Sequence, residues 1–225
     1  MTETMSLSDH DRVTEAVGEA ERLTDGEIVT VVSAQSDDYR ETPYKWALAA
    51  LFLYLSSLAI IPGFHLAALQ WLTGGWEHVY TPAEYMTMIL ALASLKFIIV
   101  FLLVRWRPLR IALTPKSIRH ARVRTRAVTM FKVGAERRTI GLTGILIYLS
   151  MAEHRAEIVA DEAIAAKVDP DIWGDAMAAM VAELKQGRPG AGMAAAVEKV
   201  GIVLAEHFPK SQGNPNELPD RLIEL

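Results

Sequence analysis

Two long apolar runs dominate the hydropathy pattern of this chain. Residues Trp46 to Leu66 contain no charged side chain, and residues Tyr85 to Val104 contain only Lys96. About twenty apolar residues in a helix cross the roughly 30 Å hydrocarbon core of a bilayer. A helix in the core of a soluble protein keeps a polar face, which neither run has. The pattern therefore predicts two transmembrane helices joined by a short polar loop.

Basic residues flank this hairpin and predict its orientation. No Lys or Arg occurs from position 46 to position 95, and the connecting segment carries Glu77 and Glu84. Arg40 and Lys45 precede the first run, and a dense series of Lys and Arg residues follows the second run from Arg105 onward. An excess of Lys and Arg marks the cytoplasmic side of membrane helices. We therefore expect a two-pass protein with both termini in the cytoplasm.

The segments outside the hairpin alternate between helical and strand patterns. Apolar positions at helical spacing predict a first helix over residues 9–23, with Ser8 as its N-cap. Runs of β-branched and apolar residues predict three strands, at 28–34, at 145–150 and ending near Ala160. Capping residues and apolar spacing predict further helices at 115–132, 161–168, 171–187 and from Gly190 or Gly192 to Pro209.

The connections between the strands predict the fold class. A short turn joins the second and third strands, so these two should form an antiparallel hairpin. A long connection with a helix joins the first and second strands, as a parallel pair requires. We expect an α/β sandwich with the membrane hairpin inserted after the first strand. The predicted domains are 9–45 with 105–209, the hairpin 46–104 and an irregular polar tail 210–225.

Composition excludes several kinds of chemistry. The 225 residues include no cysteine, so disulfides, thiol catalysis and thiolate metal sites are excluded. The formal net charge is −4, although the stretch after the second apolar run is strongly basic. A basic stretch next to a membrane helix indicates an orientation signal or a contact with anionic lipid rather than a nucleic-acid site.

Three carboxylates are candidates for chemistry. Asp37 and Asp38 follow the first predicted strand, where open α/β sheets place their ligands, and Asp161 follows the third strand. Together they could hold a divalent cation or activate water. The alternative is a solvated acidic linker for the first two and a helix N-cap for Asp161, and we favour this alternative.

Basic residues form a stripe on the predicted helix after the hairpin. Lys116, Arg119 and Arg122 lie on it, and Arg110 precedes it. Each could hold an anionic lipid headgroup, at about 1 kcal/mol apiece. An equally good interpretation is that they only orient the hairpin. Lys96, inside the second run, is either a relay or substrate site or a lysine that reaches the interface or a neighbouring helix, and we favour the latter.

Several motifs resemble the TPM-domain family, which is named for a thylakoid-lumen phosphatase-like protein, a photosystem II repair protein and a modulator of acetylcholine receptors. They are GEIVTVVSA, RVRTRAVTMFKVGAERRT, GILIYLSMAEHRAEIVADEAI, KVDPDIW and HFP…NELPD. The chain is most similar to a bacterial branch with the domain on the cytoplasmic side of a membrane hairpin. The resemblance implies a three-layer α/β/α sandwich. Some members are described as acid phosphatases or calcium binders and others as accessory proteins.

These observations favour a protein of the bacterial inner membrane with a non-catalytic accessory role. Its expected partners are the lipid bilayer and a membrane protein, and no cofactor is required. The alternative function is a metal-assisted phosphatase that acts on phosphomonoesters through Asp37, Asp38 and Asp161.

Overall fold

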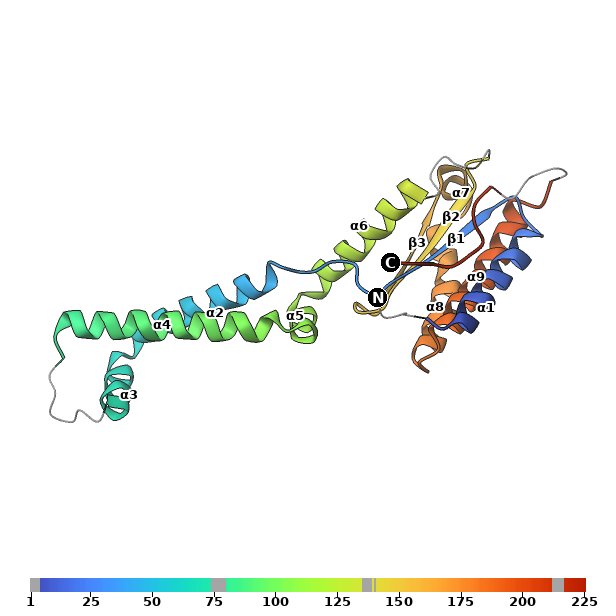
Figure 1. Cartoon of the computed structure of the whole chain (residues 1–225). Helices are drawn as coiled ribbons and strands as arrows, with labels where there is room; N and C mark the ends of the chain where they lie inside the picture. The colour runs from blue at the N-terminus through green and yellow to red at the C-terminus, as the bar shows by residue number, and fades with distance from the viewer. Residues whose placement is uncertain (1–4, 74–79, 135–138, 140, 212–216) are drawn as a thin grey trace. The chain divides into compact units, whose positions relative to one another are not determined.

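The computed structural model describes residues 5–73, 80–134, 139, 141–211 and 217–225. The chain divides into two compact units (Figure 1). The first, which we call the sheet unit, comprises Met1–Asp37 and Lys116–Leu225. The second, the helical unit, comprises Asp38–Pro115.

The sheet unit is built on a four-stranded sheet in the order β3-β2-β1-β4. The central strands β1 (Glu27–Ser33) and β2 (Gly144–Ser150) are parallel, and β3 (Arg155–Ala160) runs antiparallel to β2. These two pairings confirm the sequence prediction. Both central strands are buried along their whole length, which explains why their sequences are apolar on both faces.

The fourth strand corrects the prediction of an irregular tail. β4 (Ile223–Glu224) pairs in parallel with Val31 and Val32 of β1. The Leu225 N–H donates to the Val32 carbonyl at 2.9 Å, and the Ala34 N–H donates to the Leu225 carbonyl at 3.1 Å. The last residues of the chain therefore cover the edge of β1.

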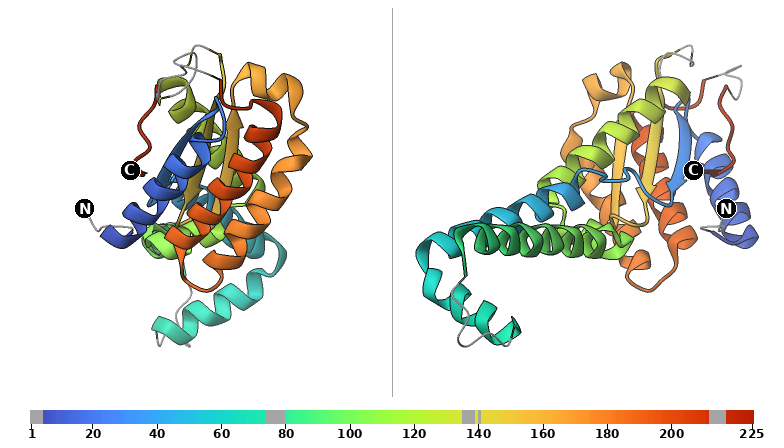
Figure 2. Two further views of the ribbon diagram at one scale, coloured as in Figure 1. Left: turned by 90° about the vertical axis from the view of Figure 1, so that its right-hand side faces the viewer. Right: turned by 60° about the vertical axis from the view of Figure 1, so that its left-hand side comes forward.

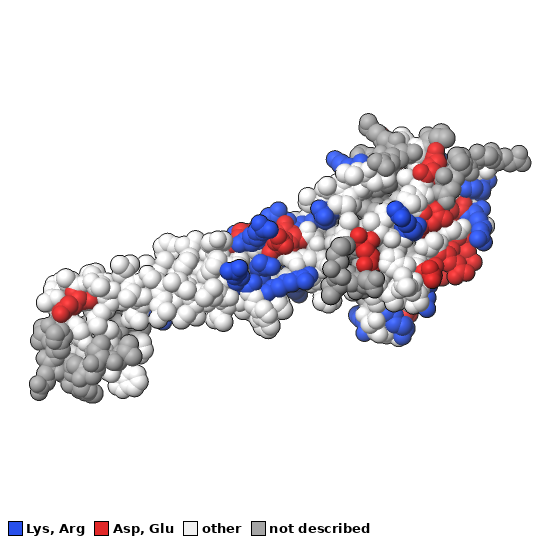
Figure 3. All heavy atoms as spheres, in the orientation of Figure 1, with Lys and Arg blue, Asp and Glu red and all other residues white. Residues whose placement is uncertain are grey.

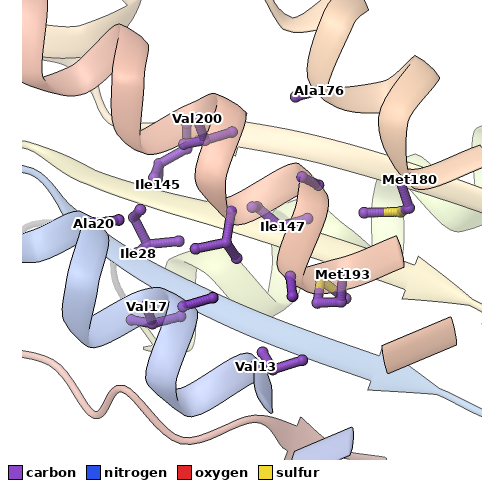
Figure 4. Close-up of a cluster of buried hydrophobic side chains, with 14 of the residues drawn as sticks. Val13, Val17, Ala20, Ile28, Ile145, Ile147, Ala176, Met180, Met193 and Val200 are labelled. Atoms are coloured by element: carbon purple, nitrogen blue, oxygen red, sulfur yellow. The ribbon is translucent and has the colours of Figure 1, made fainter. Parts of the chain in front are cut away.

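Three helices cover one face of the sheet (Figure 2). They are α1 (Leu7–Glu21), α8 (Gly174–Leu184) and α9 (Pro189–His207). Their apolar side chains meet Ile28, Ile145 and Ile147 in the main core (Figure 4). The N-cap of α1 is Ser6 instead of Ser8, because Ser6 and Asp9 form a capping box. The short helix α7 (Glu162–Lys167) and a 3-10 turn (Pro170–Trp173) lead from β3 to α8.

The other face of the sheet is covered by α6 (Lys116–Gly134). Val123, Ala127 and Phe131 recur at helical spacing and pack on the β1 and β2 side chains of that face. The sheet thus lies between helices on both sides, which is the mixed α/β architecture predicted from the sequence.

Glycine allows two helices of the main core to approach closely. A Cβ atom at Gly201 of α9 would lie 2.6 Å from the Ala20 Cβ of α1. Real Cβ atoms do not come so close, so any larger residue at position 201 must push the two helices apart.

The described residues of the helical unit form four helices. They are α2 (Thr42–Ile60), α3 (Pro62–Thr73), α4 (Pro82–Arg105) and α5 (Arg107–Leu113). The sequence leaves open whether Pro62 ends the first apolar helix or only kinks it. The helix ends at Ile60, because Ile61 leaves the helical conformation and Pro62 begins α3. The connection between the two long helices therefore contains a helix where a simple loop was expected.

The two long helices expose most of their apolar surface. In α2 only 17% of the most apolar window is buried, and in α4 only 11%. Leu53 and Leu90 are 73% and 68% exposed. On the face shown in Figure 3, these helices carry almost no charged side chain between their ends.

Candidate functional site

A buried polar cluster lies at the carboxyl edge of β1 and β2. Its members, which we call the edge cluster, are Ser36, Tyr148, Ser150 and Glu153. The Ser36 hydroxyl donates to Ser150 Oγ at 2.8 Å, and the Ser150 hydroxyl donates to Glu153 Oε2. Since each hydroxyl has one proton, the 2.9 Å contact between Tyr148 and Ser36 is donated by the tyrosine. The result is a relay of three hydroxyls that ends on a carboxylate.

Strand alternation and a tight turn build the edge cluster. Tyr148 is buried among the side chains that α6 covers, whereas its neighbours Ile147 and Leu149 belong to the main core. The turn after β2 places His154 at a φ of +51° and brings Glu153 back over the strand end. Both Glu153 carboxylate oxygens then lie 3.2 Å from the Ser36 backbone N–H.

The geometry shows what the edge cluster does in the fold. Ser150 is fully buried and Glu153 is only 4% exposed, and the hydroxyl protons of both serines are used inside the cluster. A buried carboxylate is stabilised by such donors. The edge cluster therefore fixes Ser36, the point at which the chain continues from β1 toward the helical unit.

Asp37 is held by an arginine of α6. Its Oδ2 lies 3.3 Å from Arg122 Nε, and both residues belong to the sheet unit. The pair joins the end of β1 to the helix that covers the sheet. Arg122, one of the four predicted lipid contacts, is thus paired with Asp37, one of the three candidate catalytic carboxylates.

The structure does not bring the three candidate carboxylates into one site. Asp161 caps α7 by accepting the Glu162 N–H at 2.9 Å, and its own N–H donates to the Gly144 carbonyl at the amino end of β2. Asp37 lies beyond the opposite end of the sheet, a strand length of roughly 20 Å away. Asp38 belongs to the helical unit, where Arg40 donates to it at 2.9 Å. Within the described ranges, no three His, Cys, Asp or Glu side chains are grouped to hold a metal ion.

The basic residues of α6 differ in their partners. Arg124 donates to Glu157 at 3.2 Å and to the Ile158 carbonyl at 3.0 Å, so β3 engages it. Lys116 is exposed, and Arg119 has a buried Nε atom without an acceptor. Neither has a carboxylate partner in the part of the chain that the structure describes. Arg110, the fourth predicted contact, lies in α5 of the helical unit.

Two buried glutamates lie at the amino edge of the sheet. Glu21 Oε1 accepts the Ile28 N–H at 2.7 Å, whereas Oε2 has no hydrogen-bond partner among the described residues. Burial raises the pKa of Glu21 to about 8, and the nearby carboxylates of Glu27 and Asp220 act in the same direction. Burial also raises the pKa of Glu27, whose Oε2 accepts the Leu218 N–H at 3.2 Å. Glu27 thus anchors the segment that leads to β4, whereas Glu21 is bonded to β1 itself.

The predicted transmembrane residues occupy the helical unit as follows. Trp46 lies in α2 and donates to the Leu113 carbonyl at 3.2 Å. Leu66 belongs to α3, while Tyr85 and Val104 lie near the two ends of α4. The Lys96 ammonium lies 5.0 Å from the centre of the Tyr54 ring, so a neighbouring helix supplies its partner.

The sequence reasoning missed the edge cluster and both buried glutamates. A signal for Tyr148 and Ser150 was present, because polar groups recur every second residue at the end of an otherwise apolar strand. Glu153 follows in a turn, and Glu21 ends a helix, so each resembles an ordinary surface carboxylate. Their burial depends on contacts with segments distant in sequence.

Comparisons with known proteins agree with this architecture. Residues 109–203 match the model of the family described as TPM domain. The resemblance noted in the sequence is therefore confirmed over residues 109–203. The BA42 protein from the psychrophilic bacterium Bizionia argentinensis, solved by NMR, has a similar structure, with a TM-score of 0.58 and 17% sequence identity over 100% of this chain and 98% of that chain. That likeness concerns the fold. No curated protein matches the sequence significantly.

Proposed function

We propose that this chain is a two-pass membrane protein whose TPM domain serves as a non-catalytic accessory module at the cytoplasmic surface. In this proposal, α2 and α4 span the inner membrane and both termini remain in the cytoplasm. The domain then meets anionic lipid headgroups, and a membrane-protein partner, through basic residues next to the bilayer.

The exposed apolar surface of α2 and α4 is the observation that carries the proposal. A core helix of a soluble protein buries most of its apolar side chains, whereas Phe52, Leu53 and Leu102 are 65%, 73% and 56% exposed. A surface of this kind is unfavourable in water and suits hydrocarbon. The length of α4, 24 residues, is also sufficient to cross the bilayer.

The partners of the basic residues support a narrower assignment of the lipid contact. Arg122 and Arg124 have carboxylates beside them, so an anionic lipid would have to compete with Asp37 and Glu157. Lys116 and Arg119 have no such competitor among the residues described. We therefore assign the lipid contact of α6 chiefly to these two residues, and we keep Arg110 of the helical unit as a further candidate.

The phosphatase alternative lacks an observation in its favour. It needs carboxylates that converge on a cation or a water molecule. Asp37 and Asp161 lie at opposite edges of the sheet, and Asp37 is paired with Arg122. Hydrolysis of p-nitrophenyl phosphate by the purified protein, abolished by Asp37→Asn, would reverse this judgement.

Lipid retention tests the proposed contact. The full-length protein is reconstituted in nanodiscs of mixed phosphatidylcholine and phosphatidylglycerol, and the lipids that remain bound are counted by native mass spectrometry. Lys116→Gln with Arg119→Gln should reduce the retained phosphatidylglycerol, since each cation contributes about 1 kcal/mol. The matched control, Arg122→Gln with Arg124→Gln, removes the same charge and should have a smaller effect. Equal losses in the two pairs would contradict the assignment.

A further inference from the structure

The helical unit contains a pocket of about 260 Å³ between α2, α3 and α4. Leu, Ile, Met, Phe and Ala side chains form most of its wall. Four polar side chains also line it: Tyr54, His65, Tyr85 and Lys96. An apolar pocket with a few convergent polar groups is the usual form of a small-molecule site.

Lys96 faces this pocket instead of the nearer end of its helix. It precedes Arg105 by nine residues, about 14 Å of helix, and follows Pro82 by fourteen, about 21 Å. Helical side chains lean toward the helix N-terminus, and the other pocket residues of α4 all precede Lys96. A lysine that reached for the closer interface would lean the other way.

Among the residues that the structure describes, no carboxylate of the hairpin forms an ion pair with this ammonium group. Residues 46–72 contain no Asp or Glu, and Glu84 closes the capping box at the first turn of α4. The same segment of a second copy would be equally devoid of acid. Tyr54 gives the cation the face of its ring, and a bound molecule can supply the opposite charge.

The helix α3 brings a histidine to the pocket. The Ser57 hydroxyl donates to the Tyr54 carbonyl at 2.7 Å, and therefore Ser57 Oγ accepts from His65 Nε2 at 3.0 Å. The His65 ring also lies edge-on to Tyr54, with 5.6 Å between the ring centres. These contacts hold His65 on the pocket wall, with its Nδ1 atom not used in them.

We infer that the pocket binds a lipophilic carboxylic acid, with the carboxylate beside Lys96 and the hydrocarbon chain along the apolar wall. The inference rests on the proposed membrane insertion of α2 and α4. A carboxylic acid can cross hydrocarbon in its protonated, neutral form. The phosphate of a phospholipid keeps its charge and stays at the bilayer surface, far from a residue in the middle of α4.

Fluorescent fatty-acid binding tests the inference. The full-length protein is placed in phosphatidylcholine nanodiscs, and energy transfer from tryptophan to cis-parinaric acid is measured, with empty nanodiscs subtracted. We expect saturable binding that Lys96→Met weakens at least tenfold and Lys96→Arg largely preserves. The matched control Arg105→Met removes a cation from the same helix outside the pocket and should leave binding unchanged. Leu92→Trp should abolish binding by filling the pocket.

A competition assay tests the proposed ligand, and a carbonate extraction tests the membrane insertion on which the inference rests. A fatty alcohol of equal chain length should compete at least tenfold less well than the acid, and phosphatidylglycerol should not displace it. Equal binding to wild type and Lys96→Met, equal competition by the alcohol, or displacement by phosphatidylglycerol would each overturn the inference. Alkaline carbonate extraction separates this result from the proposed function. A chain that stays in the membrane without binding the acid refutes only the pocket, whereas a chain released by carbonate refutes the membrane proposal itself.

Discussion

Replacement of Glu21 by glutamine should make the protein more stable at alkaline pH. The glutamine keeps an oxygen for the Ile28 N–H, which Glu21 now accepts at 2.7 Å, and it removes the titrating group. It also removes the charge that Glu21 would place near Glu27 and Asp220 once it ionises. The substitution therefore isolates the electrostatic cost of this buried carboxylate.

The magnitude follows from the difference in pKa between the folded and unfolded states. The pKa of Glu21 is about 8 in the folded protein and 4.5 as the ordinary value. Between these limits the folded state holds a proton that the unfolded state releases, so stability falls as pH rises, by up to about 1.4 kcal/mol per pH unit. The stability that the protonated Glu21 contributes is fully present below pH 4.5 and is lost as the pH rises through 8. The free energy of unfolding of the wild type should therefore fall by about 2 to 4 kcal/mol across this pH window, with allowance for relaxation of the protein around the charge.

Thermal unfolding at several pH values measures this effect. Circular dichroism of the detergent-solubilised protein should show a falling melting temperature between pH 6 and pH 9 for the wild type and a weaker fall for Glu21→Gln. The raised pKa of Glu27 leaves some dependence in the variant. Glu19→Gln changes the same charge on an exposed position of α1 and serves as the control. Parallel pH profiles for the wild type and Glu21→Gln would refute the reasoning.

Three further predictions concern the sheet unit. Gly201→Leu should destabilise the protein by about 1 to 3 kcal/mol in thermal unfolding by forcing α1 and α9 apart, whereas Gly174→Ala, with open space around it, should not. Glu153→Ala should cost about 1 to 3 kcal/mol, since it leaves buried donors without an acceptor, and hydrogen exchange should rise at the end of β1. Removal of residues 223–225 should raise exchange at the Ala34 N–H, because its acceptor is lost. An unchanged melting temperature for Gly201→Leu or Glu153→Ala, or unchanged exchange after removal of residues 223–225, would contradict the role given to the corresponding contact.

The elements that the sequence predicted correctly are those with a local signal. The strands around Val29 and Ile147 are apolar on both faces because the sheet is covered on both sides, and a strong apolar run marks them. The short turn and the long connection between strands then determine which pairs are antiparallel and which are parallel. The two long apolar helices were predicted equally clearly by their apolar runs.

The features that were missed depend on contacts between distant segments. β4 is held by backbone hydrogen bonds of Leu225. Such bonds do not depend on the side chains, so they leave almost no pattern in the sequence. Glu153 and Glu21 became buried only because other elements fold over them. The grouping of Asp37 with Asp161, which the sequence offered only as the less favoured alternative, fails for a geometric reason: β3 is antiparallel, so its carboxyl end lies at the opposite edge of the sheet. The antiparallel pairing that the short turn predicts already implies that Asp161, which follows the third strand, lies at the edge opposite Asp37.

Thiol labelling tests the central claim, a cytoplasmic α/β domain interrupted by a hairpin that crosses the membrane. The natural chain contains no cysteine, so each introduced thiol reports on one position. Intact bacterial spheroplasts that express Glu77→Cys or Lys185→Cys are treated with a membrane-impermeant maleimide. The account predicts labelling at position 77 in intact spheroplasts and at position 185 only after permeabilisation. Labelling of position 185 from outside, or protection of position 77 until lysis, would contradict it.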